Sequence, residues 1–328
     1  MTRVAAIQME AKVADLNFNL YFHPLTEKHT LRDDAVSNLM DSFDRQFVLA
    51  KYRIGSELKS REHTLNKRYD LRFLNAISEE VKTGFMQENT VFRLYDLLFQ
   101  LYEKEAHEDI FHKMKKQLSE SIENIRKTDQ SLLLTQMINY TVRQINTGNS
   151  AFYKESLDLY KLTLEYELVV ENDRMPEAVF GNIVLLGCHA GEFDWTKEFI
   201  GDYQNYLEEN IREDAVALNT GLWHFHREDF EGAYNWFFNH SFSHFYQPKA
   251  RLNLIRTLFE QFLLDESLYD LLIANIEAFE KFLHRNEVIP DNLKEADLNS
   301  ILVLKRFVTG IFQKKDISKL QKSLLEQI

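Results

Sequence analysis

Four histidines are clustered in the second half of the chain, at positions His224, His226, His240 and His244. The last two are four residues apart, which places both side chains on one face of a helix, and a helix hairpin would bring the two pairs together. Imidazole is the commonest transition-metal ligand, and Glu228 or Asp229 could add an oxygen ligand. The cluster gives one hypothesis, a metal-binding protein or a metal-dependent enzyme.

The aromatic side chains around these histidines favour a different interpretation. Among the neighbours are Trp223, Phe225, Trp236, Phe237 and Phe238. Such a composition is typical of a packed aromatic core, in which a histidine is a packing residue whose polar tip is hydrogen-bonded. We therefore keep metal binding as the alternative and predict no metal and no cofactor.

Other candidates for catalysis have unsuitable spacing. Cys188 is followed directly by His189, but adjacent residues point about 100° apart on a helix. His107 and His112 are five residues apart rather than the four of the zinc metallopeptidase motif, so they cannot reach one ion from a regular helix. The sequence predicts that the protein is not an enzyme.

Composition narrows the class of protein further. The chain has 328 residues, a formal net charge of −12 and a single cysteine. The negative charge repels phosphate backbones, which argues against nucleic acid as a partner. One cysteine excludes an internal disulfide framework, and no apolar stretch approaches the roughly 20 residues of a membrane helix. We expect a cytoplasmic protein with no membrane contact.

Prolines mark the beginnings of predicted helices. Ten glycines and four prolines are few for a chain of this length, which favours helices over sheets. Pro176, Pro248 and Pro290 each precede a long helical pattern, as expected of a proline in a first turn. Pro176 and Pro248 are 72 residues apart, two units of 36, with an acidic helix start at 212–214 between them. This spacing predicts helical repeats.

The segment from Pro176 to Tyr246 resembles the tetratricopeptide family. The characteristic positions of that family's repeat unit correspond to Gly221 in the first helix, Glu228-Asp229-Phe230 in the turn, and Ala233 with Phe237 in the second helix. One unit earlier, the corresponding residues are Val184, Gly191-Glu192-Phe193 and Thr196, so the family's glycine and alanine are replaced there. The resemblance implies an all-α fold, an α-solenoid of antiparallel helix hairpins wound as a right-handed superhelix.

The predicted array covers residues 36–328, in the approximate units 36–88, 89–127, 128–175, 176–212, 213–247, 248–289 and 290–328. Asn89-Thr90 and Thr128-Asp129 are predicted helix caps. In 110–125, Phe111, Met114, Leu118, Ile122 and Ile125 form one apolar stripe. In 41–59 the predicted stripe consists of Phe43, Phe47, Leu49, Tyr52 and Ile54.

Residues 1–35 are predicted to be a helix and a loop, or a fragment of a preceding repeat. Val4, Ile7, Val13 and Leu16 have the spacing of an interior stripe, whereas the outer face of a terminal repeat is normally polar. This leaves self-association possible at that end.

The tetratricopeptide-like register also predicts a binding surface. The lining of the concave face would include Leu185, His189, Leu218, Leu222, Phe225, His226, Arg256 and Phe259. Because this lining is mostly apolar, it must be covered by an amphipathic helix or peptide of a partner or by another part of the chain. We therefore expect a non-catalytic protein-interaction scaffold with a protein or peptide partner.

Overall fold

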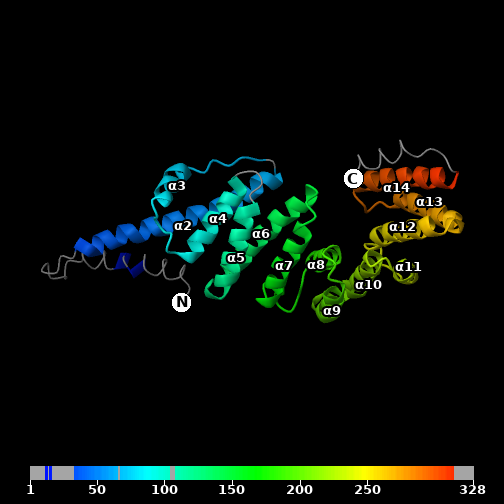
Figure 1. Ribbon diagram of the computed structural model, residues 1–328, viewed down its shortest axis with the longest axis horizontal. Helices are drawn as coiled ribbons and strands as arrows, with labels where there is room; N and C mark the ends of the chain where they lie inside the picture. Colours follow the sequence, from blue (N-terminus) through cyan, green and yellow to red (C-terminus); the bar gives the residue numbers. More distant parts are fainter. Residues whose placement is uncertain (1–11, 14, 17–32, 66, 104–107, 314–328) are drawn as a thin grey trace. The chain divides into compact units, whose positions relative to one another are not determined.

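The computed structural model describes residues 12–13, 15–16, 33–65, 67–103 and 108–313. These ranges contain thirteen α-helices and no β-strand (Figure 1). The chain divides into two compact units, residues 1–168 and 169–328. None of the helices described is both long enough and apolar enough to cross a lipid bilayer.

The first unit contains six of the helices, which are α2 (Asp33–Leu65), α3 (Leu74–Lys82), α4 (Thr90–Glu103), α5 (Glu108–Ser121), α6 (Lys127–Asn146) and α7 (Phe152–Glu165). Neighbouring helices pack as α4 with α5 and α6 with α7. Helices that are separated by one helix in the chain also touch, since α4 contacts both α2 and α6.

The second unit repeats this pattern with α8 (Glu177–His189), α9 (Phe193–Tyr203), α10 (Glu209–His226), α11 (Phe230–Asn239), α12 (Gln247–Leu264), α13 (Tyr269–Arg285) and α14 (Asp291–Phe312). The pairs α8 with α9, α10 with α11 and α12 with α13 each pack together across a short connection, and α13 packs on α14. The helix α10 contacts both α8 and α12.

The prolines begin helices as predicted. Pro176 and Pro290 directly precede α8 and α14, and Pro248 lies in the first turn of α12. The predicted helix start at 212–214 is wrong, because α10 begins at Glu209. Asp214 therefore lies inside that helix.

One of the two predicted caps in the first unit is confirmed. The Asn89 side chain accepts a hydrogen bond from the Phe92 backbone N–H at 3.0 Å, at the start of α4. Asp129 is not a cap, because α6 already begins at Lys127. Its carboxylate is 1% exposed, accepts a hydrogen bond from the Tyr95 hydroxyl at 2.6 Å and lies 3.3 Å from Arg53 Nε.

The apolar stripe predicted in 110–125 is confirmed, and the one predicted in 41–59 is wrong. In α5, the short 3-10 helix after it and the residue that follows, all five predicted residues are buried. In α2 the predicted single stripe is wrong: Leu49 and Tyr52 are buried, whereas Phe43, Phe47 and Ile54 are 46%, 46% and 60% exposed.

The predicted N-terminal stripe falls mostly on residues that the structure does not describe, Val4 and Ile7 among them. Val13 and Leu16 are described and are 48% and 61% exposed, so they are not interior residues.

A glycine allows close helix packing in each of two hairpins of the second unit. A Cβ atom on Gly221 of α10 would lie 2.4 Å from the Phe237 ring of α11. In the preceding hairpin the close contact is at Gly187, where a Cβ would lie 2.1 Å from the Thr196 hydroxyl. The tetratricopeptide-like register predicts the small residue of this hairpin at Val184, about one turn before Gly187. Both helix pairs can therefore pack this closely because glycine has no Cβ atom at these two positions.

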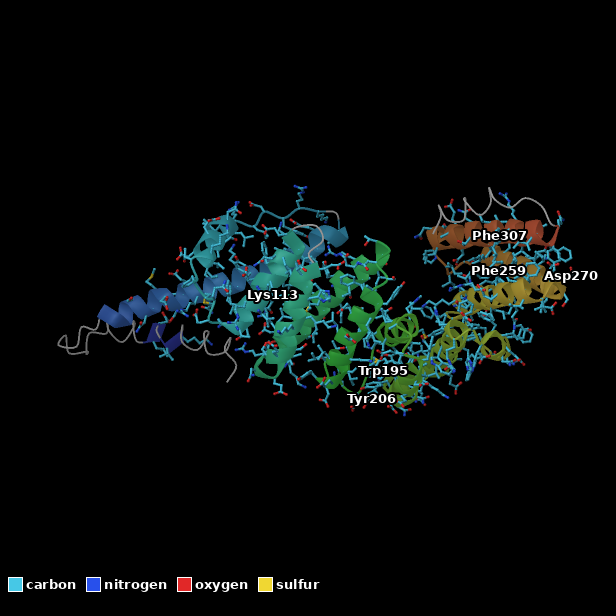
Figure 2. All side chains as sticks on the ribbon, viewed as in Figure 1. Lys113, Trp195, Tyr206, Phe259, Asp270 and Phe307 are labelled. Atoms are coloured by element: carbon cyan, nitrogen blue, oxygen red, sulfur yellow. The ribbon has the colours of Figure 1, made fainter. Side chains whose placement is uncertain are left out.

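The last helix covers part of α12. Figure 2 labels Phe259 on α12 and Phe307 on α14, and their ring centroids are 6.1 Å apart. Phe259 is half-buried in this contact.

Candidate functional site

The predicted binding residues lie on three helices of the second unit. Leu185 and His189 are on α8, Leu218, Leu222, Phe225 and His226 are on α10, and Arg256 and Phe259 are on α12. Because α10 packs against both other helices, the three segments are neighbours in space. We call this surface the α8–α10–α12 face.

The exposure of these residues differs from the predicted apolar lining. Leu218 is only 5% exposed, so it belongs to the core and not to a surface. Phe259 is partly covered by Phe307. Leu185 is 38% exposed, Leu222 is half-buried, and His189 and Arg256 are exposed. The accessible part of the face is therefore mixed, with polar groups beside apolar ones.

Four side chains from the three helices meet on this face, and we call them the His–Arg cluster: His189, Phe225, His226 and Arg256. The ring centroids of His189 and His226 are 4.6 Å apart in an edge-to-face arrangement. The guanidinium carbon of Arg256 lies 5.0 Å from the centre of the Phe225 ring, a cation–π contact. One Arg256 nitrogen also donates to the Asn253 side chain at 3.2 Å.

Burial and the neighbouring positive charge keep both imidazoles neutral. Burial lowers the pKa of His226 to about 4, and His189 and Arg256 add to this effect. The His189 ring is partly desolvated where it packs on His226, and this desolvation and Arg256 lower its pKa. Partial desolvation also lowers the pKa of Arg256, which Glu260 opposes. At neutral pH the cluster thus has one formal charge, on Arg256, beside two neutral rings that can each donate and accept a hydrogen bond.

The four histidines of the alternative metal-binding hypothesis do not converge on one point. His224 Nδ1 lies 2.6 Å from Asp229 Oδ2, at the turn where Asp229 caps α11. His226 packs on His189, whereas His240 lies 2.8 Å from Asp214 and His244 lies 3.3 Å from Asn286. Among the described residues, no group of three or more His, Cys, Asp or Glu side chains is placed to hold a metal ion. Each imidazole instead has a different partner within the protein.

Asp214 is a residue whose role the sequence analysis missed. One of its carboxylate oxygens pairs with His240 Nε2, and the other accepts a hydrogen bond from the Ser243 backbone N–H at 3.0 Å. Burial raises the pKa of Asp214, but the bonds from Ser243 and His240 outweigh it, so that the pKa is lowered. This carboxylate ties the segment after α11 back to α10.

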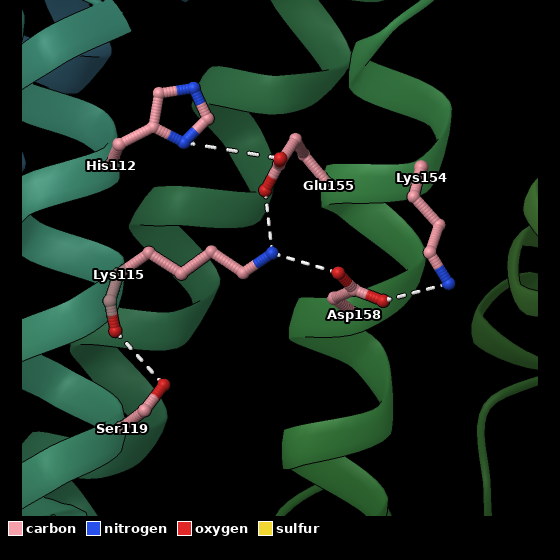
Figure 3. Close-up of polar contacts among 6 residues, drawn as sticks. All are labelled: His112, Lys115, Ser119, Lys154, Glu155 and Asp158. Atoms are coloured by element: carbon pink, nitrogen blue, oxygen red, sulfur yellow. Dashed lines mark hydrogen bonds and ion pairs between the residues drawn. The ribbon is translucent and has the colours of Figure 1, made fainter.

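A second polar cluster, also missed, joins α5 to α7 in the first unit (Figure 3). Lys115 Nζ lies 2.5 Å from Glu155 and 2.9 Å from Asp158, and Lys154 also approaches Asp158, at 3.3 Å. Burial raises the pKa of Asp158, but the two lysines outweigh it and lower the pKa. The available signal in the sequence was two acidic residues three apart, Glu155 and Asp158, although their partner on α5 is 40 or more residues away. The cluster joins two alternate helices.

The candidates for nucleophilic catalysis find no support in the geometry. Cys188 is buried, and burial raises the pKa of its thiol to about 12. The adjacent His189 packs on His226. His107 lies outside the described residues, and His112 Nδ1 is 3.9 Å from Glu155.

Comparison with known proteins adds no further assignment, because the chain matches no family model, no curated protein and no solved structure. On the α8–α10–α12 face, polar, aromatic and aliphatic groups converge from three helices. Such a combination suits recognition of another protein surface.

Proposed function

We propose that this chain is a non-catalytic interaction scaffold that binds a helix or peptide of a partner protein on the α8–α10–α12 face. The observation that carries the proposal is the His–Arg cluster, in which side chains from three helices meet beside the 38% exposed Leu185. Aromatic and arginine side chains are the residues that most often dominate binding energy at protein interfaces.

The packing of the helices supports a solenoid of hairpins with a tetratricopeptide-like register. Within the second unit, the pairs α8–α9, α10–α11 and α12–α13 each pack across a short turn, and α10, the first helix of its pair, touches both α8 and α12. Within the first unit, α4–α5 and α6–α7 pack in the same way, and α4 touches α6. The close approach of Phe237 to Gly221 fits the small residue that this family has in its first helix. In a solenoid, the first helices of successive pairs line one continuous surface, which suits an extended ligand.

The partner that fits this face presents apolar side chains and one acidic group. Leu185, Leu222 and Phe225 supply apolar surface, and Arg256 supplies the positive charge. In a chain of net charge −12, an exposed arginine on an aromatic ring is a local attraction for a carboxylate.

The test uses the whole chain as bait in an extract of the organism that makes it, followed by calorimetry with the purified partner. Leu222→Asp combined with Phe225→Asp should weaken binding at least about tenfold. The matched control is Leu264→Asp, at an 80% exposed leucine on α12, which should bind normally. Circular dichroism checks that each variant is folded. Unchanged affinity of a folded double variant would contradict the proposal.

A further inference from the structure

The helix α2 has two apolar faces. One consists of Leu39, Val48, Leu49 and Tyr52, each no more than 7% exposed. This face packs on α4, where the Tyr52 ring lies 5.0 Å from the Phe92 ring. It accounts for the position of α2 in the first unit.

The other face is exposed, and we call it the α2 stripe: Met40, Phe43, Phe47, Ala50 and Ile54. The four large side chains are 59%, 46%, 46% and 60% exposed, in that order along the chain. At 100° per residue, the stripe points to the side of α2 opposite its core face. Its steps of three, four, three and four residues are those of a coiled-coil seam.

Two further side chains extend this apolar surface. The Phe73 ring, at the start of α3, is 69% exposed. Lys51 Nζ lies 5.5 Å from the centre of the Phe47 ring and 5.9 Å from that of Phe73. The surface therefore consists of large apolar side chains with an ammonium group at its edge, a composition that monomeric proteins rarely leave uncovered.

We propose that the α2 stripe is a homodimer interface, in which α2 of a second copy packs antiparallel about a two-fold axis at Phe47. The sizes of the side chains fit this register. Phe47 meets itself at the axis, Met40 lies across from Ile54 of the second copy, and the large Phe43, four residues before the axis, lies nearest to the small Ala50, three residues after it. Because a two-fold interface must be complementary to itself, the space beside the small Ala50 can take the Phe43 ring of the second copy at both symmetry-related places.

Charge selects the same orientation. Asp44 and Lys51 flank the stripe on the same edge, three residues before and four residues after the axis. In an antiparallel pair, each Asp44 lies across from Lys51 of the second copy, so the attraction occurs twice. The interface lies in the first unit and is independent of the proposed function of the α8–α10–α12 face.

The first experiment is sedimentation velocity of the full chain from about 1 to 100 μM, where an interface of this kind should show a concentration-dependent dimer. Phe47→Glu puts two carboxylates at the axis and should raise the dimer Kd at least about 100-fold. Phe238→Glu is the matched control, at a 56% exposed phenylalanine on α11, and should leave the dimer unchanged. Circular dichroism verifies that both variants are folded.

The second experiment tests the register with engineered disulfides under mild oxidation. Phe47→Cys alone should form a covalent dimer, because the axis brings its two copies within the roughly 7 Å between Cα atoms that a disulfide allows. Met40→Cys should not link to itself but should link to Ile54→Cys when the two proteins are mixed. The native Cys188 is buried and gives little background.

Three outcomes would overturn the proposal. They are a chain that is monomeric throughout the concentration range, a dimer that persists in Phe47→Glu, and a link of Met40→Cys to itself, which shows parallel helices. A monomer in which Phe47→Cys is protected from maleimide would show that another segment of the same chain covers the stripe.

Exchanging the charges in D44K/K51D should preserve the dimer, whereas either single change should weaken it.

Discussion

The low pKa of His226 predicts that the second unit loses stability on mild acidification. The folded pKa is about 4 and the ordinary value is 6.5, so between these values the unfolded chain takes up a proton that the folded chain does not. The contribution of His226 to stability is therefore complete above pH 6.5 and is lost as the pH falls toward 4. At pH 5 the loss from this group amounts to about 2 kcal/mol, and it approaches about 3 kcal/mol below pH 4.

The assay is urea unfolding followed by tryptophan fluorescence at pH 7.5 and pH 5. Trp195, Trp223 and Trp236 are the three tryptophans of the chain, and all belong to the second unit, so the signal reports on that unit alone. His226→Gln should remove about 2 kcal/mol of the pH-dependent loss. The control His284→Gln, at an exposed position of α13, should keep the full loss.

A direct measurement complements the unfolding curves. Proton NMR titration should give the His226 ring a pKa near 4, with the signal assigned by its absence in His226→Gln. The reasoning is refuted if that ring titrates near 6.5, or if the substituted protein loses as much stability between the two pH values as the original.

Three further predictions concern packing and buried charge. Lys115→Met removes the cation between two half-buried carboxylates and should cost about 1 kcal/mol in thermal or urea unfolding by circular dichroism; an unchanged midpoint would show that the cluster contributes nothing. Gly221→Ala places a methyl group against the Phe237 ring and should cost about 1 to 3 kcal/mol, whereas Gly201→Ala, where nothing lies within 4 Å, should stabilise α9 by up to about 1 kcal/mol. Asp129→Ala leaves a buried tyrosine hydroxyl without its acceptor and should cost about 2 to 3 kcal/mol, and a loss below 0.5 kcal/mol would contradict the role given to that carboxylate.

Helices with one apolar face were predictable from the sequence, and helices with two were not. In α5, Phe111, Met114 and Leu118 follow a single stripe among charged residues, so the pattern identifies the buried side. In α2, Phe47 and Tyr52 belong to opposite faces. Periodicity alone cannot say which of them is inside, because that depends on where α4 packs.

The candidate site was predictable as a region but not as a set of contacts. The register placed His189, His226 and Arg256 on the first helices of three successive hairpins, and the structure brings their side chains together. It could not show that Leu218 is buried, since a rotation of the helix by one residue, about 100°, is enough to move a position from the surface to the core. Nor could the register show that the clustered histidines have different partners, because the partner of His240 lies 26 residues away, at Asp214.

The short separation between packed helices has a consequence for folding kinetics. In both units, the helices that pack extensively are next to each other in the chain or separated by one helix, apart from a smaller contact of α2 with α6. Contacts that close only short loops cost little chain entropy to form, and helical proteins with mostly local contacts fold in microseconds to milliseconds. Each hairpin can therefore start to form as soon as its second helix leaves the ribosome, before the rest of the chain has been synthesised.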